Sequence, residues 1–399
     1  MRILFANNLC GHYGGVEQTI AHTARALAAK GHECHLAYAS AGRNPEEFAR
    51  LFASVTRCRE FGGPPQQAGG QLFADIIARC KPDVLFVHKI SQLPEGVEHA
   101  RNYRKIVLVH DNDMWCPTGL GYDRRTRKLC THSAGWQCYL SFAFLEKRES
   151  KLMPFRIVSV REKICEMQRY HQFDSILANS NFIREKLLAN GFPFDRTRVC
   201  HPALNQPEPA PSPVPDESVI LYVGSLIRGK GVDLLLEALP HLRCPYQLYI
   251  VGVGKSQDAL KRKARDLGIA GAVHFEGWIP NEKIAGYYQR ARVVAVPSAW
   301  PEPFGLVGLE AMRHGRPVVA FRTGGIPDWL VNEENGLLAP SLDVAAYAAA
   351  LERALAEPGL AKRLGENGAR RAREKFSFEK YLNRLEQFLA GAGVADEPA

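Results

Sequence analysis

The sequence predicts an α/β protein with two domains, each a parallel sheet covered by helices. Two stretches carry this prediction, because residues 2–39 and 293–321 each read as strand, glycine-containing loop, helix and strand. A third observation divides the chain: from Pro207 to Pro215 a proline stands at every second position. Alternating prolines form an extended, semi-rigid spacer, so we expect one domain on each side of it.

The N-terminal half shows short apolar runs that alternate with amphipathic stretches. Strands are expected at residues 2–7, 34–39, 83–87, 105–109, 173–178 and 198–202. Helices are expected at residues 16–30, 71–80 and 181–189. Residues 142–168 are also predicted to be largely helical, despite Pro154.

The C-terminal half repeats the pattern. Strands are expected at residues 219–223, 247–251, 273–277, 293–296 and 318–321. Helices are expected at residues 232–242, 257–267, 281–290, 343–356, 359–374 and 377–389. These elements predict an N-terminal domain at 1–206, which carries a cysteine-containing basic insert at 112–140, and the linker at 207–215. A C-terminal domain is expected at 216–375. Residues 376–399 are expected to form a terminal helix that crosses back to the first domain, followed by a tail.

Composition limits the class of protein. A chain of 399 residues with 46% hydrophobic content can bury two cores, and no apolar run approaches the roughly 20 residues of a membrane span. The N-terminal residues turn polar too early for a signal peptide, and ten cysteines are scattered without a small-domain framework. These features predict a cytoplasmic protein.

The net charge of +9 is unevenly distributed. Residues 1–210 hold 28 Lys and Arg against 20 Asp and Glu, so most of the excess lies in the first half. That half is expected to meet an anion: a lipid headgroup, a lipid-linked phosphate or an acidic glycan. The basic and apolar residues of 142–168 have two interpretations, a surface on an anionic bilayer or the cover of a core. No helix-turn-helix, zinc-finger or stacking-aromatic pattern favours nucleic acid.

The most informative chemistry follows the fourth strand of the C-terminal half. If a helix begins near Gly305, the N–H groups of Phe304, Gly305 and Leu306 point out of its N-terminus, where phosphate or a sugar oxygen binds. Glu302 precedes this loop, and Glu310 lies about one turn inside the helix. Carboxylates accept hydrogen bonds from hydroxyl pairs and repel phosphate. A phosphate site between two carboxylates therefore suggests a nucleotide-sugar.

Four motifs occur here in the order Pro-Ser-x3-Glu-Pro-Phe-Gly, Glu-Ala-Met, Gly-x-Pro-Val-Val-Ala and Gly-Gly-Ile-Pro-Asp. Together they closely resemble the nucleotide-sugar signature of the family-4 glycosyltransferases, the "glycosyl transferases group 1" type, and a weaker resemblance runs along nearly the whole chain. The resemblance implies the GT-B architecture, with two Rossmann-like α/β/α domains facing a central cleft. It also implies that the anomeric configuration of the sugar is retained.

The resemblance implies roles for residues of the C-terminal domain. Glu302 is expected to hold the sugar hydroxyls of the donor, and Glu310 its ribose. Lys230 matches a family lysine that contacts the diphosphate. The family more often has an arginine where this chain has Ser225, so Arg228 is expected to supply that charge.

It also implies roles in the N-terminal domain. Gly14 and Gly15 belong to a Gly-Gly-Val-Glu loop that is similar to a family loop facing the diphosphate, although a glycine pair is also an ordinary tight turn. His110 ends a strand and matches a family histidine near the reacting centre. Asp111 and Asp113 spell Asp-x-Asp, which binds a divalent ion in a different glycosyltransferase fold. The family match argues against that use here.

The basic insert offers an alternative metal site. Zinc is held tetrahedrally by cysteine and histidine, and four such residues lie in this region: Cys116, Cys130, His132 and Cys138. The spacing contains no Cys-x-x-Cys pair. Unlinked or weakly packed thiols are therefore the default expectation, and a structural zinc is the alternative.

These observations predict a glycosyltransferase that moves a sugar from a nucleoside-diphosphate sugar to a lipid-linked or glycan acceptor, in cell-envelope or exopolysaccharide biosynthesis. No cofactor or metal ion is expected to be required, because cationic side chains can neutralise the diphosphate. Any membrane association would be peripheral, at the inner face of the cell membrane. The alternatives are a nucleotide-sugar epimerase or a phosphorylase with the same fold, a hydrolase that uses Glu302 and Glu310, and a non-catalytic nucleotide-sugar-binding protein.

Overall fold

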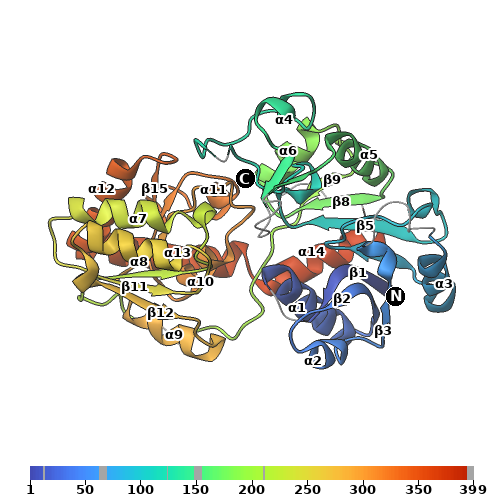
Figure 1. Ribbon diagram of the computed structural model, residues 1–399. Helices are drawn as coiled ribbons and strands as arrows, with labels where there is room; N and C mark the ends of the chain where they lie inside the picture. Colours follow the sequence, from blue (N-terminus) through green and yellow to red (C-terminus); the bar gives the residue numbers. More distant parts are fainter. Residues whose placement is uncertain (12–13, 63–69, 124, 148–154, 210–211, 393–399) are drawn as a thin grey trace. The chain divides into compact units, whose positions relative to one another are not determined.

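The computed structural model describes residues 1–11, 14–62, 70–123, 125–147, 155–209 and 212–392 (Figure 1). The chain forms two compact units. The first comprises the described parts of Met1–Gly121, Thr131–Pro202 and Phe378–Ala399. The second comprises those of Tyr122–Cys130 and Ala203–Ser377. Among the described residues, no helix is both long and apolar enough to cross a bilayer.

A seven-stranded sheet forms the centre of the first unit. Its strands are β1 (Arg2–Cys10), β2 (Glu33–Ala41), β3 (Ser54–Arg57), β4 (Val84–Val87), β5 (Arg104–Val109), β8 (Ser175–Ala178) and β9 (Thr197–Val199). They lie in the order β3-β2-β1-β4-β5-β8-β9, and every neighbouring pair is parallel. β4 and β8 are buried along their whole length, as expected for strands that helices cover on both faces.

The last described helix belongs to this first unit. The helices of the unit are α1 (Gly15–Ala29), α2 (Pro45–Ala49), α3 (Gln71–Cys80), α4 (Gln137–Leu140), α5 (Val160–Tyr170), α6 (Asn181–Ala189) and α14 (Phe378–Ala390). α14 packs against α1 (Figure 1). The hydroxyls of Thr23 and Tyr381 lie 3.0 Å apart, and Lys30 forms an ion pair with Glu386. The chain therefore returns to the first unit after it has completed the second.

The second unit is built on a six-stranded parallel sheet in the order β12-β11-β10-β13-β14-β15. Its strands are β10 (Val219–Val223), β11 (Gln247–Val251), β12 (Val273–Gly277), β13 (Val293–Val296), β14 (Val318–Phe321) and β15 (Leu337–Ala339). Its helices are α7 (Val232–Ala238), α8 (Gln257–Asp266), α9 (Asn281–Arg290), α10 (Leu306–Arg313), α11 (Ile326–Trp329), α12 (Val344–Ala356) and α13 (Pro358–Lys375). Alternate residues of β10 and β13 enter two apolar clusters, one on each face, as the two-residue repeat of a strand requires.

The prediction of a largely helical segment at residues 142–168 is wrong. The described part contains two antiparallel strands, β6 (Leu145–Lys147) and β7 (Phe155–Ile157), and its helix begins only with α5. In β7 apolar and charged residues alternate, a repeat that favours a strand over a helix. Ser159 caps α5 by accepting a hydrogen bond from the N–H of Glu162.

Part of the predicted insert at 112–140 groups with the second unit. Residues 122–130 cluster there, while the flanking residues cluster with the first unit. The guanidinium of Arg127 donates to both carboxylate oxygens of Asp233, at 3.2 and 2.6 Å, in the first turn of α7. A bidentate ion pair of this kind fixes direction as well as distance, so it anchors this part of the insert on α7.

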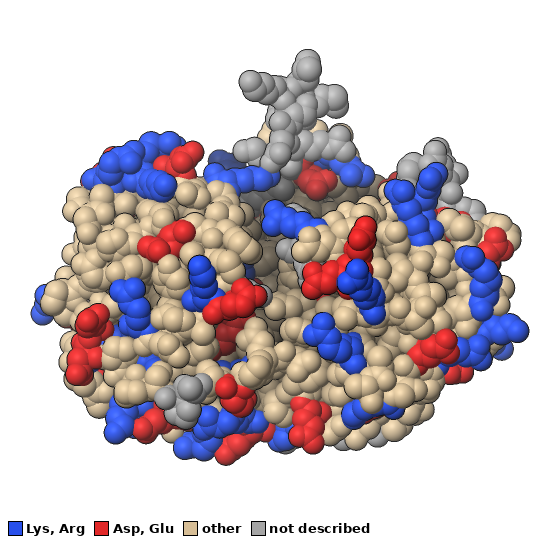
Figure 2. Space-filling model, turned by 90° about the horizontal axis from the view of Figure 1, so that it is seen from below, with Lys and Arg blue, Asp and Glu red and all other residues tan. Residues whose placement is uncertain are grey.

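The surface carries both signs of charge. On the face shown in Figure 2, Lys and Arg side chains are interspersed with Asp and Glu side chains. The net charge of +9 is therefore not gathered into one continuous basic field among the described atoms of that face. A basic stripe of that kind would be the electrostatic footprint of nucleic-acid binding.

The carboxyl ends of the strands hold the loops that matter for function. In each sheet the strand order reverses between two neighbours, β1 and β4 in the first unit and β10 and β13 in the second. Ligands of doubly wound sheets bind at such a reversal. In the second unit Gly231 brings the loop after β10 against the loop after β13. Its φ is +69°, and a Cβ there would lie 1.8 Å from the carbonyl oxygen of Pro297.

Gly231→Ala is expected to destabilise the protein by about 2 kcal/mol or more, because alanine strains a left-handed backbone and collides with Pro297. Thermal or denaturant unfolding measures the change. Gly286→Ala is the matched control, since Gly286 lies within α9 and no described residue crowds its Cβ position. At this position alanine should raise the free energy of unfolding by about 0.5–1 kcal/mol. Equal unfolding midpoints for the two variants would contradict this explanation.

Candidate functional site

Lys230 and Glu302 form the centre of a polar cluster in the second unit. Lys230 follows β10 and Glu302 follows β13, so both stand at the strand reversal of this sheet. Lys230 Nζ donates to Glu302 Oε1 at 2.9 Å and to Oε2 at 2.8 Å. The hydroxyl of Ser298 and the indole N–H of Trp300 also donate to Oε2, at 2.8 and 2.9 Å. The buried carboxylate is thus held by one cation and two neutral donors.

Glu302 is ionised at neutral pH. Burial by itself raises the pKa of this carboxyl, but the charge and hydrogen bonds of Lys230, with those of Trp300 and Ser298, lower the pKa below its usual value. Two of the three ammonium hydrogens of Lys230 point to this carboxylate, so a third remains to reach another anion. Among the described residues Oε1 accepts only from Lys230, which leaves it able to accept from a hydroxyl.

Trp300 is a site residue that sequence reasoning missed. Its ring lies 5.2 Å from Lys230 Nζ, a cation–π distance, while its N–H donates to Glu302. One side chain therefore holds both partners of the ion pair. Trp300 occupies a variable position of the Pro-Ser-x3-Glu motif, and nothing in the sequence distinguishes it from a core tryptophan.

α10 begins at Leu306, with Gly305 as its N-cap. Gly305 has a φ of +94°, and Glu302 Cγ lies 3.2 Å from the place a Cβ would occupy, so glycine is the residue that fits without strain. The indole N–H of Trp329 donates to the carbonyl oxygen of Phe304 at 2.6 Å and supports the turn from within the core. The first amides of a helix have no acceptor inside it, so this end of α10 offers donors directly after Glu302.

Glu310 is held by Tyr288, a residue that the sequence did not indicate. The hydroxyl of Tyr288, from α9, donates to Glu310 Oε2 at 2.8 Å. His314 stacks on the Tyr288 ring, with centroids 4.8 Å apart and planes at 11°. Burial raises the pKa of Glu310, and the hydrogen bond from Tyr288 offsets part of that effect. Tyr288 lies one helix earlier in the chain, where no motif links it to Glu310.

The remaining predicted donor-site residues lie in loops or at helix ends. Arg228 is exposed in the short turn Arg228–Lys230. Gly14 caps α1, and its N–H donates to the Glu17 carboxylate at 3.0 Å. Neither Gly14 nor Gly15 has a left-handed backbone, and no described atom lies within 4 Å of the Cβ position of Gly15. The fold itself therefore does not require glycine at these two positions.

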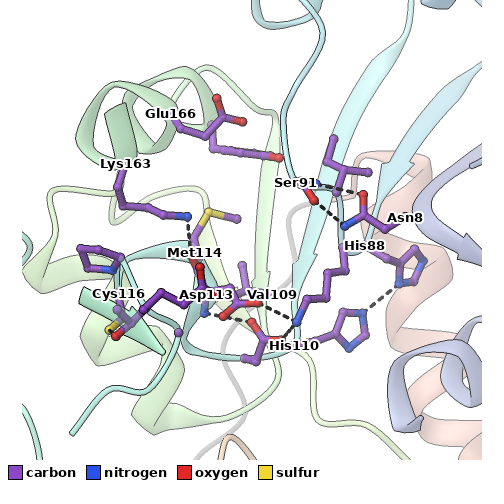
Figure 3. A pocket seen from close by; sticks show the side chains of 18 residues that line it. Asn8, His88, Ser91, Val109, His110, Asp113, Met114, Cys116, Lys163 and Glu166 are labelled. Carbon is purple, nitrogen blue, oxygen red and sulfur yellow. Dashed lines mark hydrogen bonds and ion pairs between the residues drawn. The ribbon is translucent and has the colours of Figure 1, made fainter. Parts of the chain in front are cut away.

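In the first unit, the loops after β4 and β5 line a polar cavity of about 240 Å³ (Figure 3). Its charged and histidine side chains are His88, Lys89, His110, Asp111, Asp113, Glu146, Lys163 and Glu166. Asn8 and Ser91 connect β1 to the loop after β4 through two hydrogen bonds, at 2.9 and 3.0 Å. The cavity thus stands at the strand reversal, and the predicted site residue His110 lies in it.

His88, which sequence reasoning also missed, holds His110 (Figure 3). Nδ1 of His88 and Nε2 of His110 lie 2.9 Å apart, and the rings stack with centroids at 5.2 Å. Phe5 stacks on His88 at 5.6 Å. Burial, followed by the charge of Lys89, lowers the pKa of His110 to about 3, so this imidazole is neutral at pH 7.

The hydrogen-bond pattern assigns the protons of the histidine pair. Nε2 of His88 is buried with no hydrogen-bond partner among the described residues. Orphaned buried donors are rarer in proteins than orphaned acceptors, so we assign the proton of His88 to Nδ1, which donates to His110. His110 then carries its own proton on Nδ1 and can donate there. His88 therefore fixes the tautomer of His110.

Asp111 and Asp113 do not form an open cation site. Lys89 Nζ forms ion pairs with both carboxylates, at 2.6 Å for Asp113. The Asp113 carboxylate also packs against Gly119, because a Cβ at position 119 would lie 1.8 Å from Oδ1 of Asp113. Lys163 donates to the Asp113 carbonyl oxygen at 2.6 Å. A lysine ammonium thus already balances the charge that a divalent ion would meet.

The alternative zinc set in the insert is not assembled. The described residues contain no group of three or more His, Cys, Asp or Glu side chains placed to hold a metal ion. Cys116 instead accepts from the N–H of Gly121 at 3.4 Å. Among the described residues, these four side chains therefore do not stand as a metal site.

Two parallel-sheet α/β units, each with polar loops at its strand reversal, define the GT-B class of glycosyltransferase fold. The crystal structure of HepE (Alr3699) from Anabaena in complex with UDP has this fold. It matches the present structure with a TM-score of 0.74 at 18% identity, and covers 98% of this chain and 100% of that chain.

The chain belongs to glycosyltransferase family 4. The family model "Glycosyltransferase Family 4" matches residues 13–206, and "Glycosyl transferases group 1" matches residues 206–371. The lipopolysaccharide core biosynthesis glycosyltransferase LpsE of Rhizobium meliloti (strain 1021) is 31% identical over 266 residues, which are 61% of this chain and 73% of LpsE. The uncharacterized glycosyltransferase MJ1607 of Methanocaldococcus jannaschii is 34% identical over 166 residues, 41% of this chain and 42% of that protein. The chain thus spans less than half of MJ1607 and most of LpsE.

The neutral His110 predicts a pH-dependent stability. Its pKa of about 3 in the folded protein lies below the ordinary 6.5, so the unfolded chain binds more protons between these values. The free energy of unfolding should therefore fall as the pH drops from 6.5 toward 3. His110→Asn removes this titration, so the loss of melting temperature from about pH 7 to about pH 5 should be smaller than in the wild type. The same loss in both proteins would contradict the assignment.

Proposed function

We propose that the protein is a retaining glycosyltransferase that moves a sugar from a nucleoside-diphosphate sugar to an acceptor held by the first unit. One observation carries the proposal: the Lys230–Glu302 pair stands at the strand reversal of the second unit, directly before the N-terminus of α10. The pair and the helix end offer a cation, a carboxylate oxygen and backbone donors within one loop. These are the groups that a sugar diphosphate needs for recognition.

Lys230 and Arg228 are proposed to stabilise the departing diphosphate. Negative charge grows on this group in the transition state, while the sugar acquires oxocarbenium character. The backbone amides of Gly305 and Leu306, at the N-terminus of α10, would share in this stabilisation, which is electrostatic and preorganised. Since these groups supply the neutralising charge, we propose that the reaction requires no metal ion.

Two carboxylates are proposed to recognise the hydroxyls of the donor. Glu302 would accept from the sugar hydroxyls through Oε1, and Glu310 would accept from the ribose diol while Tyr288 holds it in place. Gly14 and Gly15 would let the diphosphate approach the backbone closely, and no described atom lies within 4 Å of the Cβ position of Gly15 to obstruct it. The structure of HepE contains UDP, which supports a nucleotide-sugar as the donor class.

The cavity around His110 is proposed to hold the acceptor, with His110 near the reacting centre. Lys89 is already engaged by two carboxylates, and Lys163 by a backbone carbonyl. The cavity therefore favours hydroxyl groups of a glycan, and an anionic or lipid part of the acceptor would lie outside it. LpsE is a glycosyltransferase of lipopolysaccharide core biosynthesis, which supports an acceptor from cell-envelope or exopolysaccharide biosynthesis. We propose that the protein meets this acceptor from the cytoplasm, at the inner face of the cell membrane.

The proposal is tested by thermal shift against UDP-, GDP-, ADP- and dTDP-sugars. One class of donor is expected to raise the melting temperature, because a ligand at 100 times its Kd stabilises the fold by about 2.7 kcal/mol. Turnover of that donor should then depend on an acceptor. The proposal is wrong if none of the four classes binds.

Glu310→Ala is expected to weaken donor binding at least about tenfold, because it removes the hydrogen-bond acceptor for the ribose diol. Tyr288→Phe keeps the ring and removes only the hydrogen bond to Glu310. It should therefore weaken the free energy of donor binding by a smaller amount, about 0.5–1.5 kcal/mol. Isothermal titration calorimetry measures both. Unchanged affinity in Glu310→Ala would rule out the ribose role.

Lys230→Ala is expected to lower kcat about a hundredfold or more, because charge on the leaving diphosphate loses its nearest cation. Lys283→Ala is the control, since Lys283 is an exposed lysine of α9 outside the cluster. Steady-state kinetics at saturating donor separate kcat from KM. If the two variants retained the same kcat, Lys230 would have no role in turnover.

A further inference from the structure

A further cavity, of about 600 Å³, lies within the second unit and is named here the Arg292 cavity. Arg292 and Asp216 line it, and they stand just before β13 and β10. Lys230 and Glu302 follow these same two strands. Because the strands are parallel, the cavity and the donor cluster stand at opposite edges of the sheet. The Arg292 cavity is therefore a separate site, and its volume suits a small molecule.

The proline run forms one apolar wall of the Arg292 cavity. The residues of the run that line it are Pro209, Pro213, Val214 and Pro215. Two arginines of the second unit hold the backbone of this wall. Arg316 donates to the carbonyl oxygen of Pro213 at 2.8 Å, and Arg292 donates to that of Pro215 at 3.2 Å. The run is thus attached to the second unit at these positions, and its rings border the cavity.

One face of α13 forms another wall. The residues of α13 that line the cavity beyond its first turn are Lys362, Glu366, Ala369 and Arg373. Spacings of three and four residues place these side chains on the same side of a helix. Gly365 lets α13 lie against the end of α10, since a Cβ there would be 2.2 Å from the carbonyl oxygen of Gly315. Neither Lys362 nor Arg373 forms an ion pair with another described residue.

Arg292 brings a buried cation to the cavity. The residue is only 4% exposed. Its Nη1 donates to the carbonyl oxygens of Pro215 and Asp216, at 3.2 and 2.9 Å, and its Nε donates to that of Ala354 at 3.4 Å. Its Nη2 has no hydrogen-bond partner among the described residues. Arginine stays charged when it is buried, so Nη2 offers two N–H donors to an anion in the cavity.

The other charged side chains of the cavity are less favourable to an anion. Arg313 is already paired with Glu208, at 3.2 Å. Asp216 and Glu366 are carboxylates and repel an anion, but both are exposed, so solvent and salt screen them. Arg292 is buried, and its charge is screened less. We therefore expect the anion to bind at Arg292.

The chemistry of the walls indicates the class of ligand. Arg292, Lys362 and Arg373 supply several N–H donors, and a phosphomonoester has three acceptor oxygens and up to two negative charges. A carboxylate has two oxygens and one charge, so it would use these donors less fully. Proline-rich segments pack well against aromatic rings, which favours a ring on the wall that the proline run forms.

We propose that the Arg292 cavity binds a small organic phosphomonoester with an apolar ring. The phosphate accepts hydrogen bonds from Arg292 Nη2, Lys362 and Arg373, and the ring packs on the prolines. His314 lines the cavity and also stacks on Tyr288. The ligand therefore lies close to a neighbour of the ring that supports the proposed ribose site. This binding does not depend on the proposed function.

Isothermal titration calorimetry of the full chain with phenyl phosphate tests the proposal. Phenol and inorganic phosphate are the matched probes, because each carries one half of phenyl phosphate. We expect phenyl phosphate to bind at least about tenfold more tightly than either half, since only the whole molecule meets both the cations and the prolines.

The double variant Lys362→Ala with Arg373→Ala is expected to weaken the binding of phenyl phosphate at least about tenfold. The matched control is Arg370→Ala with Lys375→Ala, which removes the same charge from exposed positions of α13 outside the cavity. This control should bind as the wild type does. Arg292 itself is left unchanged, because it also holds the backbone of the proline run.

Lys230→Ala separates the Arg292 cavity from the donor cluster and should leave the binding of phenyl phosphate unchanged. If Lys230→Ala abolished binding, the probe would occupy the donor cluster and the proposal would be wrong. It would also be wrong if phenyl phosphate did not bind, if inorganic phosphate bound equally well, or if the two double variants lost the same affinity. Circular dichroism melting shows whether the variants fold, and Lys362→Ala alone replaces the double variant if that protein is unfolded.

Discussion

The ion pair between Lys230 and Glu302 is the interaction on which the candidate site depends. A buried carboxylate is unfavourable unless a cation and further donors satisfy it, and here Ser298 and Trp300 complete the set. The two partners stand in loops that follow neighbouring strands, so they meet only if those loops touch. Gly231 permits that contact because it has no side chain to separate them. The same pair therefore contributes to the fold of the second unit and to the chemistry proposed for it.

The first unit repeats this arrangement with different chemistry. At its strand reversal a neutral histidine pair replaces the ion pair, and Lys89 is surrounded by Asp111 and Asp113. Neutral His110 can donate a hydrogen bond through Nδ1 beside a reacting sugar without adding charge to the cavity. In both units a buried group with a proposed role is held by a side chain from another loop: His88, after β4, holds His110, and Lys230, after β10, holds Glu302.

The fold and the location of the loops could be predicted from the sequence, because strands that are covered on both faces are continuous apolar runs such as β4 and β10. The family could be predicted from the four motifs of the nucleotide-sugar signature. The helical prediction at 142–168 failed, since β7 is three residues long and its partner strand lies eight positions earlier. The sequence did not indicate a role for three further residues, His88, Tyr288 and Trp300, for another reason. Each acts through a contact that exists only after folding, and none stands in a motif that indicates its partner.

Because α14 packs on α1, segments that precede and follow the second unit in the chain belong to one cooperative structure. During synthesis the residues of α14 leave the ribosome after those of the second unit, so the first unit cannot reach its final packing until α14 has emerged. The second unit has no such delay, because its described segments have all emerged by Ser377. The first unit is thus expected to be the later of the two to mature, and a fragment cut at the proline run would leave the side of α1 that carries Thr23 and Lys30 without α14.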